Sequence, residues 1–184
     1  KKYKMSKIKN ALISVSNKEN LKLILHSLKK NKINIISSGG TYETIKKLGY
    51  QCKEISQYTG FKEMLDGRVK TLHPKIHSGI LFKRDKKTHR KQMQKKRFEP
   101  IDLVIVNFYP FEKTIKKSSN TEKIIENIDI GGPSLVRAAA KNFKSVTIIT
   151  EKEDYSELIK ELKKFSGRTT LDFRKKMAGK AYGL

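Results

Sequence analysis

At 184 residues the chain has the length of one domain, with room for a sizeable core. Its net charge of +24 suggests a nucleic-acid partner. However, the 35 Lys and 7 Arg residues are spread over nearly every segment. Nucleic-acid surfaces more typically cluster their cations and interleave Arg and aromatic residues. The single cysteine, Cys52, excludes an intrachain disulfide. The chain shows no signal-peptide pattern and no apolar run near the ~18 residues of a membrane span. We therefore expect a cytoplasmic protein without a membrane or nucleic-acid partner.

Strand and helix patterns alternate along the first part of the chain. Short apolar runs predict buried strands, and apolar residues recur at helical spacing after Lys18. Thr41 can cap a short helix that Gly49 ends. The expected elements are a strand at Asn10–Val15, a helix at Lys18–Lys30, a strand at Ile33–Ile36, a helix at Tyr42–Lys47 and a short strand at Gln51–Ile55.

The pattern loses its period from Ser56 to Gly79. A long irregular connection inside a compact domain is usually functional or mobile. His73 and His77 have the spacing of two metal ligands on a helix, but Pro74 lies between them and favours a loop. A structural or substrate-contacting role for the two histidines is therefore preferred to a metal site.

The alternation resumes after this connection. The expected elements are a strand-like piece at Gly79–Phe82, helices at Lys86–Lys96, Phe111–Lys116 and Thr121–Asn127, a strand at Asp102–Asn107, a helix at Ser134–Asn142 that begins with Ser134 as a possible N-cap, a strand at Ser145–Ile149, and helices at Glu151–Lys164 and from Thr170 onward. Strands separated by helices predict an α/β fold with a parallel sheet between two helical layers.

Two segments rich in small residues follow predicted strands. Ser14 to Lys18 ends the first strand, and Ser37-Ser38-Gly39-Gly40-Thr41 ends the second and opens a helix. Free backbone N–H groups and the positive end of a helix dipole favour a phosphate there, and Lys18 can supply a cation. Alone, a Gly-Gly helix entry can also be a simple turn.

Four residues further along carry acid–base chemistry. Spacing alone leaves each an ordinary alternative: Asp129 as a helix cap, Lys141 as a surface lysine, Tyr109 as an amphipathic core residue, and Lys70 as a loop charge.

Several segments together match one family in order and spacing. They are Leu12-Ile13-Ser14-Val15-Ser16-Asn17-Lys18, Ser38-Gly39-Gly40-Thr41, Thr59-Gly60-Phe61, Gly67-Arg68-Val69-Lys70-Thr71-Leu72-His73-Pro74, Asn107 with Tyr109-Pro110-Phe111, and Ile128-Asp129-Ile130-Gly131-Gly132 with Arg137 to Asn142. The chain resembles the N-terminal domain of the bifunctional purine biosynthesis enzyme, which combines IMP cyclohydrolase with AICAR formyltransferase. The resemblance covers residues 9–184, leaves 1–8 as an N-terminal extension, and implies that a C-terminal formyltransferase domain is absent.

The resemblance implies a methylglyoxal-synthase-like, three-layer α/β/α fold around a mostly parallel sheet of about five strands. It also implies the last step of purine nucleotide synthesis, in which 5-formamidoimidazole-4-carboxamide ribotide closes its second ring and loses water to give IMP. No metal or organic cofactor is needed, and the full-length enzyme is expected to be a homodimer.

The resemblance also assigns residues. It implies that Lys70, Tyr109, Asp129 and Lys141 take part in cyclisation. The substrate-binding positions that it implies are Ser14, Ser16, Lys18, Ser38, Gly39, Gly40, Thr41, Arg68, Thr71, Asn107, Ile130 and Gly131. We expect Asp129 to accept a proton from the carboxamide nitrogen, Tyr109 to protonate the formyl oxygen, and Lys141 to stabilise negative charge or to keep Asp129 ionised.

Two other proteins of this fold remain alternatives. Methylglyoxal synthase is a lyase that acts on dihydroxyacetone phosphate, and the allosteric domain of carbamoyl phosphate synthetase binds effectors without catalysis. Both would use a similar phosphate site, so the segment from Ser38 to Thr41 does not discriminate between them. The Gly-Gly-Asp-Gln segment typical of the lyase is not visible, and a purely regulatory domain needs no set of acid–base residues.

Overall fold

A computed structural model describes residues 6–108, 115 and 120–183. Its five strands are β1 (Asn10–Val15), β2 (Asn34–Ser37), β3 (Lys53–Glu54), β4 (Leu103–Asn107) and β5 (Thr147–Ile149). The helices are α1 (Leu21–Lys30), α2 (Gly39–Lys47), α3 (Ile55–Thr59), α4 (Pro74–Leu81), α5 (Lys87–Lys96), α7 (Thr121–Glu126), α8 (Gly131–Lys141), α9 (Tyr155–Lys164) and α10 (Leu171–Tyr182), with short 3₁₀ turns at Leu65–Gly67 and Lys152–Asp154.

The strands form one parallel sheet in the order β3-β2-β1-β4-β5. The chain leaves β1 toward β2 and β3 on one side and later returns to β4 and β5 on the other. The direction of winding therefore reverses between β1 and β4, where Val15 pairs with Asn107. In open parallel sheets, ligands bind in the crevice outside the carboxyl ends of two such strands.

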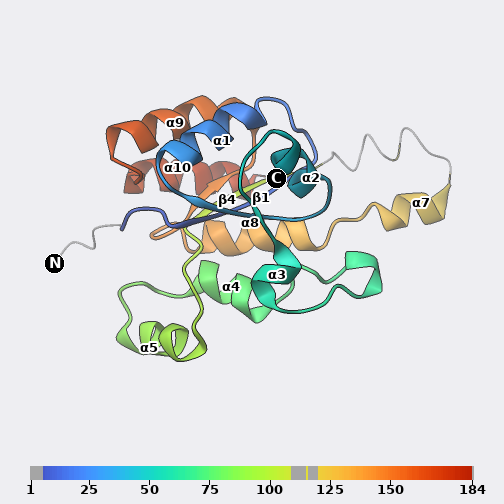
Figure 1. Ribbon diagram of the computed structural model, residues 1–184, viewed down its shortest axis with the longest axis horizontal. Coiled ribbons are helices and arrows are strands. Elements are labelled where there is room, and N and C mark those ends of the chain that lie inside the picture. The colour runs from blue at the N-terminus through green and yellow to red at the C-terminus, as the bar shows by residue number, and fades with distance from the viewer. Residues whose placement is uncertain (1–5, 109–114, 116–119, 184) are drawn as a thin grey trace.

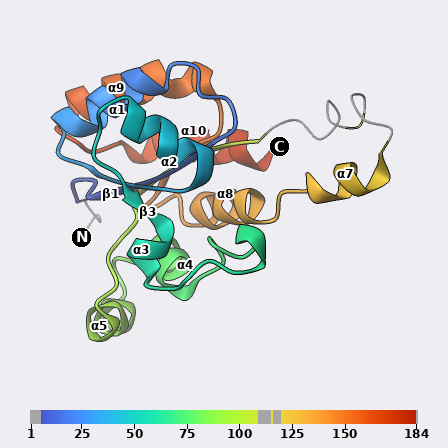
Figure 2. The ribbon, with the colours of Figure 1, turned by 45° about the vertical axis from the view of Figure 1, so that its right-hand side comes forward.

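Helices cover both faces of the sheet, which confirms the predicted three-layer α/β/α fold (Figure 1). Helices α1 and α9 pack together on one side, α8 packs on β4 from the other, and α10 packs against α8 and β5. Helix α5 stands away from the sheet (Figure 2). The central strands are apolar throughout because both faces are covered, and Leu12, Ile13, Val104 and Ile105 are at most 1% exposed.

The expected strand at Gly79–Phe82 is wrong, because residues up to Leu81 belong to α4. A short apolar run does not distinguish a buried strand from a buried helix. The expected loop around Pro74 is wrong for a related reason: Pro74 occupies the first turn of α4, where its missing N–H costs nothing, and His73 Nδ1 accepts a hydrogen bond from Lys75 N–H.

Two expected boundaries also shift. Helix α2 begins at Gly39, so its N-cap position is Ser38 rather than Thr41. Helix α8 begins at Gly131, three residues before Ser134. The expected helix at 111–116 falls on residues outside the described ranges, Ile115 apart.

Within the described part of the chain, no helix combines the length and the apolar character needed to cross a membrane.

Candidate functional site

The site is built around the first turn of α2, at the carboxyl edge of the sheet. The first helical hydrogen bond runs from Tyr42 N–H to the Ser38 carbonyl at 3.2 Å, so the N–H groups of residues 39–41 precede the helical ladder. Gly39 has a φ of +55°, a conformation that glycine adopts without strain. The positive end of the helix dipole and these N–H groups favour an anion at this point.

Two lysines flank this turn. A Cβ at Gly40 would lie 3.7 Å from Lys18 Nζ, and a Cβ at Gly39 would lie 3.3 Å from Lys70 Nζ. Lys18 follows β1 and also donates to the Val15 carbonyl at 3.2 Å, whereas Lys70 comes from the irregular segment before α4. Two ammonium groups from distant parts of the sequence therefore converge on one helix N-terminus, and they can neutralise a phosphate dianion. We call the first turn of α2 with Lys18 and Lys70 the cradle.

The hydroxyl groups around the cradle are partly engaged elsewhere. Thr41 Oγ1 donates to the Val15 carbonyl at 3.0 Å and accepts from Val15 N–H at 3.1 Å. This buried pair of bonds joins α2 to β1, so Thr41 has a structural role in addition to any contact of its N–H group. Ser38 forms no capping bond, and Ser14 lies half-buried on β1 beside Val106 of β4.

Asn107, at the end of β4, binds the turn after β1. Its Oδ1 accepts from Ser16 N–H at 2.8 Å, from Asn17 N–H at 3.1 Å and from Ser16 Oγ at 3.1 Å. Its Nδ2 donates to the Asn17 carbonyl at 3.3 Å. The side chain that the sequence suggested for substrate binding thus uses both ends of its amide on the protein itself.

The start of α8 brings a second group to the same edge of the sheet. Asp129 Oδ1 accepts from Gly132 N–H at 3.0 Å, so the helix-capping role considered for Asp129 is present. A Cβ at Gly132 would lie 2.8 Å from a ring carbon of Phe108, just beyond β4. A Cβ at Gly131 would collide with Thr71 Oγ1, so the irregular segment packs directly on the first turn of α8. Ile130, beside this turn, is exposed.

Arg68 does not point its charge at an open site. Its guanidinium is paired with Glu126 at the end of α7, with a shortest distance of 2.6 Å, and both side chains are largely exposed. Glu126 is not among the residues predicted from the sequence. No local signal marks it, because the two residues are 58 positions apart.

The remaining two predicted catalytic residues are not in this group. Tyr109 lies outside the described residues. Lys141 ends α8, about 15 Å along the helix axis from Gly131. It is exposed at the amino edge of the sheet, just ahead of β5. Within this chain the structure brings Lys70 to the cradle and Asp129 to the carboxyl edge, but it does not bring Lys141 to either.

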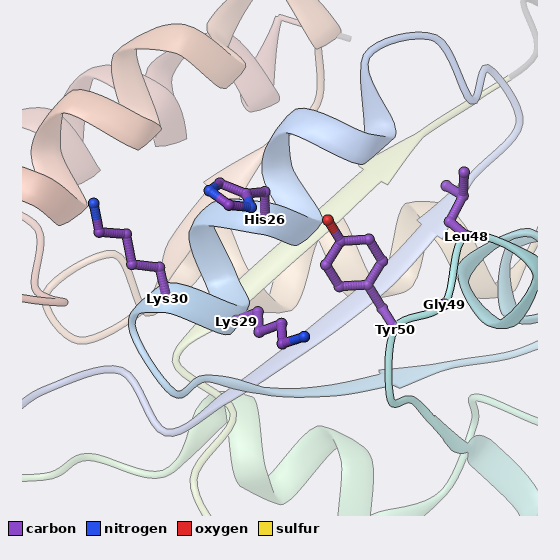
Figure 3. Close-up of a pocket in the computed structure, with 6 residues that line it drawn as sticks. All are labelled: His26, Lys29, Lys30, Leu48, Gly49 and Tyr50. Atoms are coloured by element: carbon purple, nitrogen blue, oxygen red, sulfur yellow. The ribbon is translucent and has the colours of Figure 1, made fainter.

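Two hollows on the surface lie away from the cradle. One is lined by His26, Lys29, Lys30 and the turn from Leu48 to Tyr50 (Figure 3). It lies where α1 and α2 end, about 13 Å along α2 from Gly39. A wider hollow of about 910 Å³ continues from it along β2 and β3. Lysines in the last turn of a helix complement its dipole, which explains the cations there without a ligand.

Metal and thiol chemistry have no evident centre in the described ranges. No group of three or more His, Cys, Asp or Glu side chains is placed to hold a metal ion among residues 6–108, 115 and 120–183. Burial raises the pKa of the Cys52 thiol to about 12, which keeps it protonated at neutral pH.

Comparison with protein families gives two adjoining matches. The model described as MGS-like domain matches residues 21–134, and the model described as AICARFT/IMPCHase bienzyme matches residues 139–184. Together they cover most of the chain.

Curated relatives carry the name bifunctional purine biosynthesis protein PurH. The protein from Clostridium kluyveri is 51% identical over 177 residues, which are 96% of this chain and 35% of the relative. That from Magnetococcus marinus is 47% identical over 179 residues, 97% of this chain and 34% of the relative. The chain therefore spans about a third of the length of these relatives. A solved structure titled "Crystal structure of ForH" is 28% identical, with a TM-score of 0.85 over 96% of this chain and 92% of that one.

Proposed function

Because the chain belongs to the MGS-like domain family and corresponds to the N-terminal third of bifunctional purine biosynthesis proteins, we propose that it is an IMP cyclohydrolase. The observation that carries the proposal is the pairing of Lys18 and Lys70 at the opening of α2, in a chain with this similarity. The substrate is 5-formamidoimidazole-4-carboxamide ribotide and the products are IMP and water.

The reaction forms one C–N bond and releases one water molecule. The carboxamide nitrogen attacks the formyl carbon and loses a proton, and the formyl oxygen gains a proton to give a hydroxyl group. A second proton then leaves a nitrogen of the new ring, and the hydroxyl takes up a proton and departs as water. The C–O bond breaks and a C=N double bond forms, which completes the purine. Because a carboxamide nitrogen is a poor nucleophile, the enzyme must orient it against the formyl group and assist both proton transfers.

The cradle holds the ribotide phosphate in this proposal. The N–H groups of residues 39–41 donate to phosphate oxygens, and Lys18 and Lys70 supply the balancing charge. The Ser38 hydroxyl, which forms no capping bond, contributes a further donor, whereas the Ser16 hydroxyl donates to Asn107 Oδ1 and lines the site beside Lys18. A phosphate fixed at the end of β2 directs the rest of the nucleotide along the carboxyl edge toward β4 and the start of α8.

Asp129 serves as the proton acceptor in this proposal. One of its oxygens is committed to Gly132 N–H, and this bond fixes the direction of the other oxygen. Lys70, at the cradle, is close enough to the phosphate end to act in binding as well as in chemistry. Tyr109 keeps its proposed role as proton donor to the formyl oxygen, and Gly131, Ile130 and Thr71 form the wall beside the base. Lys141 ends α8 at the other edge of the sheet from Asp129, and its expected part in the cyclisation stays a prediction.

We extend the proposal to the architecture of the longer protein. Residues 9–184 form the cyclohydrolase domain, 1–8 form an extension, and the formyltransferase activity of the bifunctional relatives belongs to sequence outside this chain. The longer protein is a cytoplasmic homodimer in this proposal.

Turnover of the purified chain tests the function. We expect the chain to form IMP from 5-formamidoimidazole-4-carboxamide ribotide, and the absorbance of IMP measures the rate. We expect Lys70→Ala to lower kcat/KM at least about a hundred-fold, because it removes a charged group from the cradle. Lys62→Ala is the matched control, because Lys62 is an exposed lysine of the same segment. It should retain the wild-type rate.

Other outcomes would replace the proposal. Formation of methylglyoxal from dihydroxyacetone phosphate, without IMP formation, would favour the lyase. Tight binding of nucleotides with no turnover of either substrate would favour a regulatory domain. Equal rates for Lys70→Ala and Lys62→Ala would remove the cradle from the mechanism even if IMP is formed.

A further inference from the structure

We propose that Asn107 is a positioning residue, which fixes the turn from Ser16 to Lys18 so that the Lys18 ammonium stands over the opening of α2. The inference deepens the proposed function and rests on it, because it concerns how the same site holds the substrate phosphate. It replaces the expected direct contact between Asn107 and the substrate with an action through Lys18.

The hydrogen bonds of the Asn107 amide support this role. Its oxygen accepts two backbone N–H groups, from Ser16 at 2.8 Å and Asn17 at 3.1 Å, and its nitrogen donates to the Asn17 carbonyl at 3.3 Å. Only an oxygen can accept from two N–H groups, so this network determines which way the amide faces. With the Ser16 hydroxyl also bound at 3.1 Å, the amide has little capacity left for a substrate.

The location of the bonds explains what they control. Asn107 ends β4, and Ser16 follows β1, so the amide joins the two strands at which the winding of the sheet reverses. Beyond the last paired residues, no backbone carbonyl of the described strands accepts from the Ser16 or Asn17 N–H group. The Asn107 side chain binds both of these N–H groups and the Asn17 carbonyl instead.

Lys18 is the next residue along the turn. Its ammonium donates to the Val15 carbonyl at 3.2 Å and lies 3.7 Å from the position of a Cβ at Gly40. A lysine has four side-chain torsions and loses much conformational freedom when it is held in one place. Holding the backbone on its N-terminal side reduces the freedom that phosphate binding must remove, which is the usual benefit of preorganisation.

Binding of inorganic phosphate and of IMP tests the inference. We expect Asn107→Ala to weaken both about ten-fold, as for the loss of one charge-assisted bond. The amide protons of Ser16 and Asn17 should exchange faster with solvent in this variant. Asn142→Ala is the matched control, because it also removes a side-chain amide that is bonded to the backbone. The Asn142 amide donates to the carbonyls of Ile80 and Phe82, at the far end of α8. Its phosphate affinity should equal that of the wild type.

A double-mutant cycle separates positioning from direct contact. If Asn107 acts through Lys18, the variant with both Asn107→Ala and Lys18→Ala binds phosphate no more weakly than Lys18→Ala alone. Independent, additive losses would overturn the inference and restore a direct contact. Wild-type affinity in folded Asn107→Ala would also overturn it.

The two proposals fail in distinguishable ways. If the wild-type chain makes IMP but Asn107→Ala shows wild-type phosphate affinity, the cyclohydrolase stands and the positioning role falls. If the wild-type chain neither makes IMP nor binds it, both fall. A variant that is too unstable to assay is replaced by Asn107→Asp, which keeps the acceptor oxygen and loses the donor. Its Ser16 and Asn17 amides should remain protected, and loss of that protection would contradict the inference.

Discussion

Thr41 and Val15 exchange two hydrogen bonds, in which the threonine hydroxyl accepts from the valine N–H at 3.1 Å and donates to the valine carbonyl at 3.0 Å. Val15 ends β1 beside Asn107 of β4, and its own N–H and carbonyl are both bonded to this hydroxyl. These two bonds hold the first turn of α2 against the end of β1. They anchor the backbone next to Gly39 and Gly40, which have no side chains of their own to pack.

The Thr41–Val15 pair predicts a stability effect. Thr41→Val keeps the shape of the side chain, but it leaves the buried Val15 N–H without its partner and the Val15 carbonyl with Lys18 as its remaining donor. We expect a loss of about 1–3 kcal/mol in the free energy of unfolding, measured by urea denaturation. Thr41→Ser keeps the hydroxyl and should lose less. Equal stability of the valine variant and the wild type would show that the pair contributes nothing.

Gly39 predicts a separation of binding from stability. In Gly39→Ala the new Cβ lies 3.3 Å from Lys70 Nζ, and the positive φ strains the backbone by about 1–2 kcal/mol. Gly49→Ala imposes the same kind of strain at φ +84°, with nothing within 4 Å of the new Cβ. We expect both variants to lose stability by calorimetry, and only Gly39→Ala to lose affinity for IMP. Equal IMP affinity in the two would argue against the cradle.

The close approach of Thr71 to Gly131 predicts that a second substitution restores the stability lost in the first. The Gly131→Ala methyl group would meet Thr71 Oγ1, but it would lie at an ordinary 3.7 Å from Thr71 Cβ. The single variant should therefore lose about 1–3 kcal/mol of stability through overpacking, and the double variant with Thr71→Ala should recover most of it. Gly179→Ala, with open space around its Cβ in α10, is the control and should be neutral or stabilising. Failure of the double variant to recover would mean that the irregular segment does not pack on α8.

His77 predicts a pH dependence of stability. Burial lowers its pKa and outweighs the hydrogen bond to the Thr71 backbone, which acts in the opposite direction. Its Nε2 is buried and has no hydrogen-bond partner among the described residues. The unfolded chain therefore takes up a proton at this side chain near pH ~6.5, before the folded chain does. Stability is present above that pH and is lost as the pH falls through the folded-state pKa.

The measurement is urea denaturation between pH 5 and 7.5, a window set by the ordinary pKa of histidine near ~6.5. His77→Gln should flatten the fall in stability on the acid side. His26→Gln, at an exposed position of α1, should leave the fall unchanged. An identical pH profile for His77→Gln and the wild type would exclude His77 as the source.

The sequence by itself determined the features that depend on near neighbours. The apolar runs of β1 and β4 predicted buried strands, the spacing in α1 predicted a helix, and Ser38-Gly39-Gly40 after a strand predicted an anion site at a helix N-terminus. Local pattern failed at Gly79–Phe82, because a short apolar run suits a helix as well as a strand and Pro74 begins a helix as readily as it breaks one.

Only the tertiary structure decided which distant residues meet. The parallel sheet brings Asn107 to Ser16 across 91 positions and lets the segment before α4 carry Lys70 to Gly39. The same geometry separates Asp129 from Lys141, because one helix of eleven residues runs from one edge of the sheet to the other. Local sequence sets the conformation of each element, whereas strand order and helix length set the distances between their ends, and the chemistry of this site depends on those distances.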